Sequence, residues 1–136
     1  MTYALHTTVS QPYAAAVEQV RTALTEQGFG VLTEIDLQAT LKARLGADIA
    51  PQVILGACRP PLAYAALQAE PAVGLLLPCN VVVRALDDTS TAVDAVDPQM
   101  MVAMTDNPEL QNVSDDATTR LRAALTSLAG TPVQAA

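Results

Sequence analysis

Residues 52–61, QVILGACRPP, place a short and almost wholly apolar run directly before two prolines. A run of this length and composition predicts a buried strand over residues 52–57. Pro60 and Pro61 suit the first turn of a helix, which needs no amide donors, so a helix is predicted to follow at once. The segment is therefore the middle of a chain in which strands and helices alternate.

Upstream, the chain predicts two more strands, each followed by a helix. Residues 2–9 and 29–36 carry the strand patterns, and the apolar–polar alternation is clean in the second. Apolar residues three and four positions apart mark the two helices. They are Tyr13, Val17, Val20 and Leu24 in the first helix, and Leu37, Leu41 and Leu45 in the second.

Downstream, residues 73–77 and 80–86 are strongly apolar on either side of Pro78, which predicts one bent strand or two. The turn residues Asp87 and Asp88 predict a hairpin whose second strand covers residues 91–96. A short helix from Pro98 to Met104 and a long periodic helix from Asn107 to Gly130 are expected next. The tail, residues 131–136, is expected to be loose.

The predicted order is β-α-β-α-β-α-β-β, with one more strand if residues 73–77 pair separately, and two helices at the end. Strand–helix–strand units usually make crossovers between parallel strands, whereas the hairpin adds an antiparallel pair. We therefore expect an α+β fold with a mixed β-sheet, helices packed on the sheet, and a single domain over residues 1–130.

The charge balance limits the partners of the chain. Seven basic residues stand against fourteen acidic ones, and the net charge is −7. Nucleic-acid binding needs clustered Lys and Arg, so neither nucleic acid nor an anionic membrane is expected as a partner. A secretory signal would need a basic start followed by an apolar run, and the sequence does not show this pattern. Two cysteines without an export signal favour the cytoplasm.

Several segments carry a family resemblance. They are Gly28-Phe29, Glu34-Ile35-Asp36, Leu41-Lys42, ILGACRP at residues 54–60, GLLLPCNVVV at residues 74–83, and Pro98 with Met100. Together they resemble the domain-of-unknown-function 302 (DUF302) family over nearly the whole chain. The resemblance implies a compact α+β fold that is often dimeric, so a homodimer is expected. It implies no established activity.

The two cysteines are the main candidates for chemistry. Cys58 ends the predicted third strand, where a following helix would offer unpaired amides that lower a thiol pKa, and Arg59 would add to this effect. If the third and fourth strands are parallel neighbours, Cys79 and the adjacent Asn80 lie at the matching end, where open α/β sheets bind ligands. In the alternative interpretation, both cysteines pack as small apolar residues.

Glu34 and Lys42 are the candidate polar members of the same pocket. Glu34 shares a predicted strand face with Leu32, and Lys42 on the next helix could reach it. A buried carboxylate needs a partner or a shifted pKa. The two residues form either a structural ion pair or a base or ligand anchor beside the cysteines.

A metal site has little support in the sequence. Met100, Met101 and Met104 cluster, and with the cysteines and the single His6 they make a soft-metal site such as Cu(I) conceivable, with Met100 and Met104 as its candidates. The spacings match no zinc or copper motif, and methionines at helical spacing usually belong to a core. No metal and no cofactor are expected.

Two functions remain open at this point. One is a small-ligand or thiol-linked module with a Cys58, Cys79, Glu34 and Lys42 pocket, and Arg59 and Asn80 beside it. The other is a non-enzymatic, homodimeric structural or interaction module in which the cysteines only pack. The residues do not decide whether the protein is an enzyme, because they show only fragments of a catalytic set.

Overall fold

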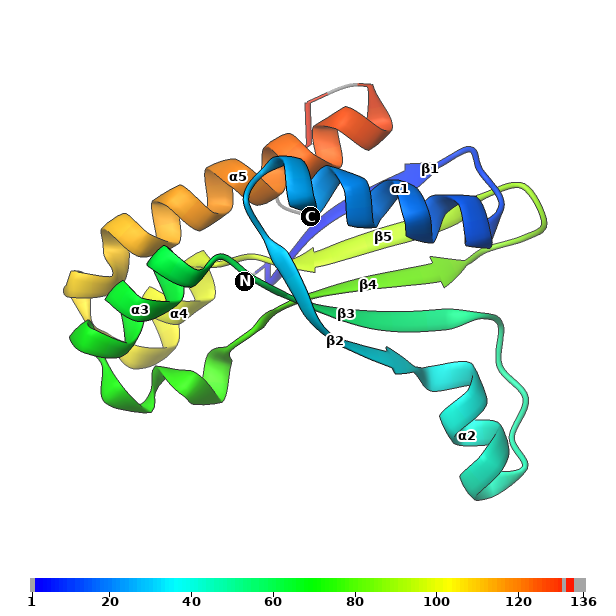
Figure 1. Ribbon diagram of the computed structural model, residues 1–136, viewed down its shortest axis with the longest axis horizontal. Helices are drawn as coiled ribbons and strands as arrows, with labels where there is room; N and C mark the ends of the chain where they lie inside the picture. Colours follow the sequence, from blue (N-terminus) through cyan, green and yellow to red (C-terminus); the bar gives the residue numbers. More distant parts are fainter. Residues whose placement is uncertain (1, 131, 134–136) are drawn as a thin grey trace.

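The computed structural model describes residues 2–130 and 132–133. Five strands form one open sheet in the spatial order β1-β5-β4-β3-β2 (Figure 1). The strands are β1 (Ala4–Val9), β2 (Gly30–Asp36), β3 (Gln52–Cys58), β4 (Cys79–Ala85) and β5 (Thr91–Val96). The helices are α1 (Tyr13–Glu26), α2 (Leu37–Leu45), α3 (Pro60–Ala69), α4 (Gln99–Thr105) and α5 (Gln111–Ala129), with 3₁₀ turns η1 (Pro71–Leu76) and η2 (Pro108–Leu110).

The α+β class and the predicted order of strands and helices are confirmed, but the pairing of the strands differs from the expectation. Every pairing among the five described strands is antiparallel, so the sheet is not mixed. The cause is visible in Figure 1, where α3 and η1 lie beyond the end of the sheet at which β3 stops. Because β4 starts at that same end, it runs back along β3, and no parallel crossover forms.

Residues 73–77 are not a strand. Most of them belong to η1, which starts at Pro71, and the chain becomes extended only from Leu77. The strand prediction for these residues fails because a short apolar run has the same sequence pattern in a buried strand and in a turn of helix. Here the run does not enter the sheet, and Leu75 is 89% exposed.

The main core lies between one face of the sheet and the helices α1 and α5, which cover that face (Figure 1). Alternate strand residues point into it, as in β4, where Val81 and Val83 are fully buried. A smaller core joins α3, η1, α4 and α5 at the end of the sheet, around Ala66, Val73 and Met101. None of the described helices is both long enough and apolar enough to cross a membrane.

The expected loose tail is described only in part, because residues 131 and 134–136 lie outside the described residues. Within it, Pro132 is exposed, whereas Val133 is buried in the main core. The backbone N–H of Val133 donates to Oγ1 of Thr126 at 3.1 Å. This one residue of the tail is therefore packed on α5.

Candidate functional site

The two cysteines lie together at one end of the sheet. Cys58 is the last residue of β3 and Cys79 is the first of β4, where Ala57 is the direct partner of Cys79. Cys79 is buried, Cys58 is half-buried, and both are free thiols. Their proximity comes from the antiparallel turn-back of the chain rather than from parallel neighbours.

The Gly-Ala-Cys and Pro-Cys-Asn segments pack directly against each other. A Cβ on Gly56 would overlap Oγ1 of Thr33 and lie 2.8 Å from Cγ of Pro78. Only a glycine leaves room for both neighbours. Gly56 and Pro78 therefore set the spacing between β3 and the segment that leads into Cys79.

The start of α3 does not offer Cys58 the amides that were expected. Pro60 and Pro61 have no N–H, and the next two amides, of Leu62 and Ala63, donate to the carbonyl of Arg59 at 3.0 and 3.1 Å. The double proline that predicts the helix thus removes the donors of its first turn. The amides that were expected to act on Cys58 are therefore missing from this turn.

Arg59 lies between this helix and the turn after α1. Gly28 has a positive φ of 84°, and a Cβ on it would lie 3.2 Å from Nε of Arg59. The Arg59 side chain therefore packs over the Gly28 backbone. It also lines the small cavity between the cysteines.

Cys79 is chemically quiet at neutral pH. Burial, with a smaller contribution from the neighbouring Cys58, raises the pKa of its thiol from 9.0 to about 11. The reactive form of a cysteine is the thiolate, so Cys79 is protonated and a poor nucleophile in the folded protein.

Two cavities of different size flank Cys79. The one shared with Cys58, under α3 and α5, has a volume of only about 20 Å³. That is room for about one water molecule. On the other side lies a cleft of about 250 Å³, named here the methionine cleft, which is lined by Tyr3, residues 75–80, residues 96–98, Met100, Met101 and Met104.

The methionine cleft continues into a second hollow of about 280 Å³. Leu75, Leu76 and Met104 line both. Leu75 and Met104 are 89% and 63% exposed, so large apolar side chains stand at the junction. Isolated exposed apolar residues are ordinary, but a group of them around a cleft makes that cleft a candidate binding site.

Asp97 supplies a carboxylate to the otherwise largely apolar methionine cleft. It was not among the candidate residues predicted from the sequence. Its side chain is buried, with 7% exposed, and Oδ1 accepts from the backbone N–H of Gln99 at 3.0 Å. An aspartate just before Pro98 and a helix was the available signal, since it reads as a helix cap. Tyr3 and Met101 join the cleft through tertiary contacts that no local pattern reports.

Glu34 and Lys42 do not lie with the cysteines, and they do not pair with each other. Oε2 of Glu34 is 2.5 Å from Nη2 of Arg21, and Nζ of Lys42 is 2.9 Å from Oδ1 of Asp48. Glu34 and Lys42 are both exposed, because β2 is an edge strand and α2 projects beyond the sheet. Of the six candidate ligand residues, the structure gathers Cys58, Arg59, Cys79 and Asn80 at one end of the sheet.

The soft-metal candidates share a cleft, but their expected companions do not. Met100 and Met104 line the methionine cleft with Cys79. His6 instead bonds through Nδ1 to Oδ1 of Asp94 at 2.5 Å, and it is exposed between the buried residues Leu5 and Thr7 of β1. Within residues 2–130 and 132–133, no three His, Cys, Asp or Glu side chains are grouped so that they could hold a metal ion.

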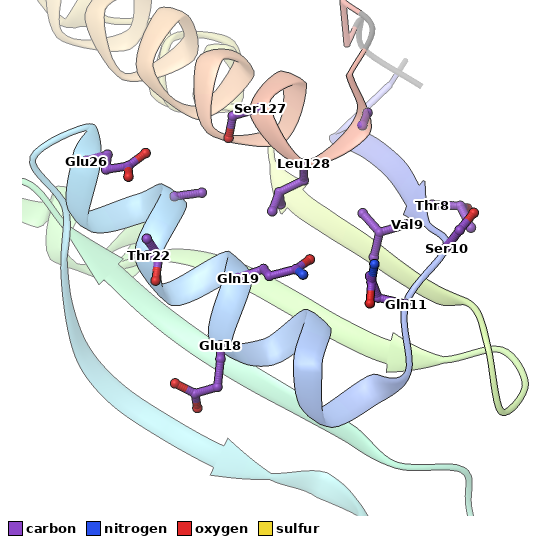
Figure 2. Close-up of a pocket in the computed structure, with 12 residues that line it drawn as sticks. Thr8, Val9, Ser10, Gln11, Glu18, Gln19, Thr22, Glu26, Ser127 and Leu128 are labelled. Carbon is purple, nitrogen blue, oxygen red and sulfur yellow. The ribbon is translucent and has the colours of Figure 1, made fainter.

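A wider hollow, of about 730 Å³, lies between the turn after β1, one face of α1 and the end of α5 (Figure 2). Its side chains are mostly polar, and Glu18, Gln19, Thr22 and Glu26 form one row along α1. These four side chains are exposed, which is the usual state of the polar face of a surface helix. The methionine cleft is the better candidate because it combines apolar walls with a buried carboxylate.

Comparisons with known proteins agree with this architecture. A family model described as "Domain of unknown function DUF302" matches residues 5–128. The crystal structure of an uncharacterized conserved DUF302 protein from Bacillus stearothermophilus is similar, with a TM-score of 0.86 and 31% sequence identity over 94% of this chain and 99% of that chain. No curated protein matches the chain.

Proposed function

The chain belongs to the DUF302 family, whose function is unassigned, and we propose that this member binds a small, largely apolar ligand non-covalently in the methionine cleft. The observation that carries the proposal is the lining of the cleft, where Leu, Met, Val and Pro side chains surround one buried carboxylate, Asp97. Ligand sites generally combine apolar walls with a few placed polar groups.

The size of the cleft favours a ligand below drug size. Its volume of about 250 Å³ is smaller than that of sites for drug-sized molecules, which begin near roughly 300 Å³. The adjoining hollow of about 280 Å³ offers an extension across Leu75 and Met104. A short alkyl chain could lie across both.

The charges favour a neutral or cationic ligand. Lys, Arg and His are absent from the described linings of both hollows, whereas Asp97 lines one and Glu70 the other. An anionic head group would meet carboxylates without a counter-charge. An amine or a hydroxyl could instead donate a hydrogen bond to Asp97.

Binding, rather than thiol chemistry, agrees with the state of the cysteines. The raised pKa of Cys79 keeps its thiol protonated, and a protonated thiol behaves as a small apolar wall residue. Two free thiols also suit a reducing compartment, so we place the protein in the cytoplasm.

The methionine methyl groups provide a direct test. The chain has four methionines, three of which line the cleft. In a protein labelled with ¹³C at the methionine methyls, octylamine and 1-octanol should shift the signals of Met100, Met101 and Met104, while octanoate should shift them far less. A protein whose three signals stay unmoved with all three compounds does not bind as proposed.

A matched pair of variants locates the effect. Leu75→Glu places a carboxylate at the mouth of the cleft and should weaken 1-octanol binding by about tenfold or more. Leu67→Glu on α3 changes a partly exposed leucine that lines neither hollow and should leave binding unchanged. Equal losses in both variants would contradict a site in the methionine cleft.

A further inference from the structure

Two carboxylates line the pair of hollows at the end of the sheet, one in each. Asp97 lines the methionine cleft, and Glu70 lines the hollow that adjoins it. Asp97 lies between β5 and α4, whereas Glu70 lies between α3 and η1. Because Leu75, Leu76 and Met104 line both hollows, the fold brings the two acidic residues to one continuous surface.

Asp97 is held in place without a counter-charge. Its Oδ1 accepts from the backbone N–H of Gln99, and the side chain is only 7% exposed. Within residues 2–130 and 132–133, Asp97 takes part in no ion pair, and its Oδ2 has no hydrogen-bond donor. A buried carboxylate without a counter-charge carries a large desolvation cost. A cation that entered the cleft would offset this cost.

Glu70 is positioned by the side chain of Asn107. Nδ2 of Asn107 donates to the carbonyl of Ala69 at 3.0 Å and to Oε1 of Glu70 at 3.2 Å. The amide is itself held, because its Oδ1 accepts from the backbone N–H of Glu109 at 3.0 Å. Glu70 is half-buried, and in the part of the chain that the structure describes it forms no ion pair. Its carboxylate is thus fixed and without a counter-charge, as that of Asp97 is.

The residues that the two hollows share are all apolar. Leu75, Leu76 and Met104 stand at the junction, and Lys, Arg and His are absent from the described linings on either side. Hydrocarbon and thioether side chains therefore lie between two sites of negative charge. The complementary ligand has a positive charge at each end and methylene groups in the middle.

We infer that the ligand class of the methionine cleft and its adjoining hollow is a linear α,ω-diamine, an alkyl chain with an ammonium group at each end. The inference rests on the proposed function, since it keeps the same cleft and adds a second anchor. One ammonium group donates to the carboxylate of Asp97 and the other to that of Glu70. The alkyl chain lies over the shared leucines and Met104.

A diamine matches this surface better than related ligands do. A monoamine or an alcohol satisfies Asp97 but leaves Glu70 without a partner. A fatty acid brings a third carboxylate to a surface that has no basic residue among those described. Free lysine has two ammonium groups, but its own carboxylate meets the same repulsion.

Calorimetric titration with α,ω-diamines from diaminobutane to diaminodecane tests the inference, and the methionine methyl signals verify the site. The ratio of diamine affinity to that of the alkylamine of equal length should pass through a maximum. At this maximum the ligand spans the two carboxylates, and the ratio should reach at least about threefold. Added salt should weaken the diamine more than the alkylamine. Diaminopentane, which is lysine without the carboxylate, should bind more tightly than lysine.

Amide variants separate the two anchors. Glu70→Gln should reduce the affinity of the best diamine to about that of its alkylamine. Asp97→Asn should weaken both amines at least about tenfold, because a buried charged hydrogen bond is lost. Glu109→Gln is the control, since Glu109 lines neither hollow and its removal should change neither affinity. Circular dichroism verifies that each variant is folded.

The results distinguish this inference from the proposed function. If octylamine and 1-octanol bind but no diamine exceeds its alkylamine, the diamine class is overturned and an apolar ligand in the cleft stands. The same conclusion follows if Glu70→Gln leaves the diamine affinity unchanged. If none of the compounds moves the methionine signals, both proposals fail.

Discussion

At Gly56, three segments of the fold lie close together. Thr33 of β2 lies on one side of it, and Pro78, just before β4, lies on the other. In the sequence this glycine stands in the Gly-Ala-Cys segment, beside a candidate reactive cysteine. Its position explains it as a packing residue, because it lets Pro78 approach β3 and so positions Cys79.

We predict that Gly56→Ala destabilises the protein by about 1–3 kcal/mol, because the new methyl group overlaps Thr33 and the rigid ring of Pro78. Urea unfolding measures the effect. Gly74→Ala is the control, since a Cβ there meets nothing within 4 Å. Equal stability of the two variants would show that the segment relaxes without cost.

Because of Cys79, the free energy of unfolding should fall at alkaline pH. Its pKa is raised from 9.0 to about 11 in the folded state, so the folded protein holds this proton more tightly than the unfolded chain does. The contribution is complete below about pH 9 and is lost as the pH rises through about 11. A shift of this size corresponds to something on the order of 2 kcal/mol.

We predict that the wild type loses more stability between about pH 8 and about pH 11 than Cys79→Ala does. Urea unfolding in the presence of a reductant checks this. The comparison with the variant is needed because burial, Asp36 and Glu34 also raise the pKa of Tyr13, so this residue adds its own alkaline pH dependence to both proteins. Parallel pH profiles for the two proteins would contradict a buried, protonated Cys79.

At the scale of the element, Ser114 of α5 does not fit its surroundings. Ser114 is fully buried, and its Oγ has no hydrogen-bond partner. A buried hydroxyl without a partner costs free energy, and serine is also a poorer helix former than alanine.

Ser114→Ala should therefore raise the free energy of unfolding by about 0.5–1 kcal/mol. Thr118→Ala, four residues on, should lower it, because Oγ1 of Thr118 donates to the carbonyl of Ser114 and accepts from Nε2 of Gln99. Thermal unfolding of both variants measures the contrast. A destabilised Ser114→Ala would mean that the hydroxyl has a partner in solution.

The elements differ in how far local sequence predicts them. The stripe from Leu110 to Leu128 predicts α5 well, because a long apolar period of three and four residues leaves few alternatives. The strand predicted for residues 73–77 is wrong, because a run of five apolar residues is compatible with a strand and with a 3₁₀ turn alike. The start of α3 is predicted correctly from Pro60 and Pro61, yet the same prolines remove the amides expected to act on Cys58.

At the scale of the whole molecule, stability is unevenly distributed. The central strands β4 and β5 have neighbours on both sides and fully buried side chains such as Val81 and Val93. Residues 30–50, which include β2 and α2, have one strand neighbour and no buried residue.

Amides of α2 should exchange with solvent by local opening at a small fraction of the global unfolding free energy. Those in the centre of β4 should exchange only near the global value. Native-state hydrogen exchange measured by mass spectrometry resolves the two segments. Equal protection of both segments would contradict a poorly packed α2.

The sequence by itself determined the family, the α+β class, the order of the elements and the two cysteines as a pair worth following. These features depend on local patterns, namely alternation, helical spacing, prolines and turn residues, and local patterns survive without knowledge of the fold. The tertiary structure decided the rest. The sheet is antiparallel, Glu34 pairs with Arg21, and Lys42 pairs with Asp48. Tyr3, Asp97 and Met101 line the same cleft as Cys79. Each of these outcomes depends on which distant segments pack together, and the spacing of residues along the chain does not encode that choice locally.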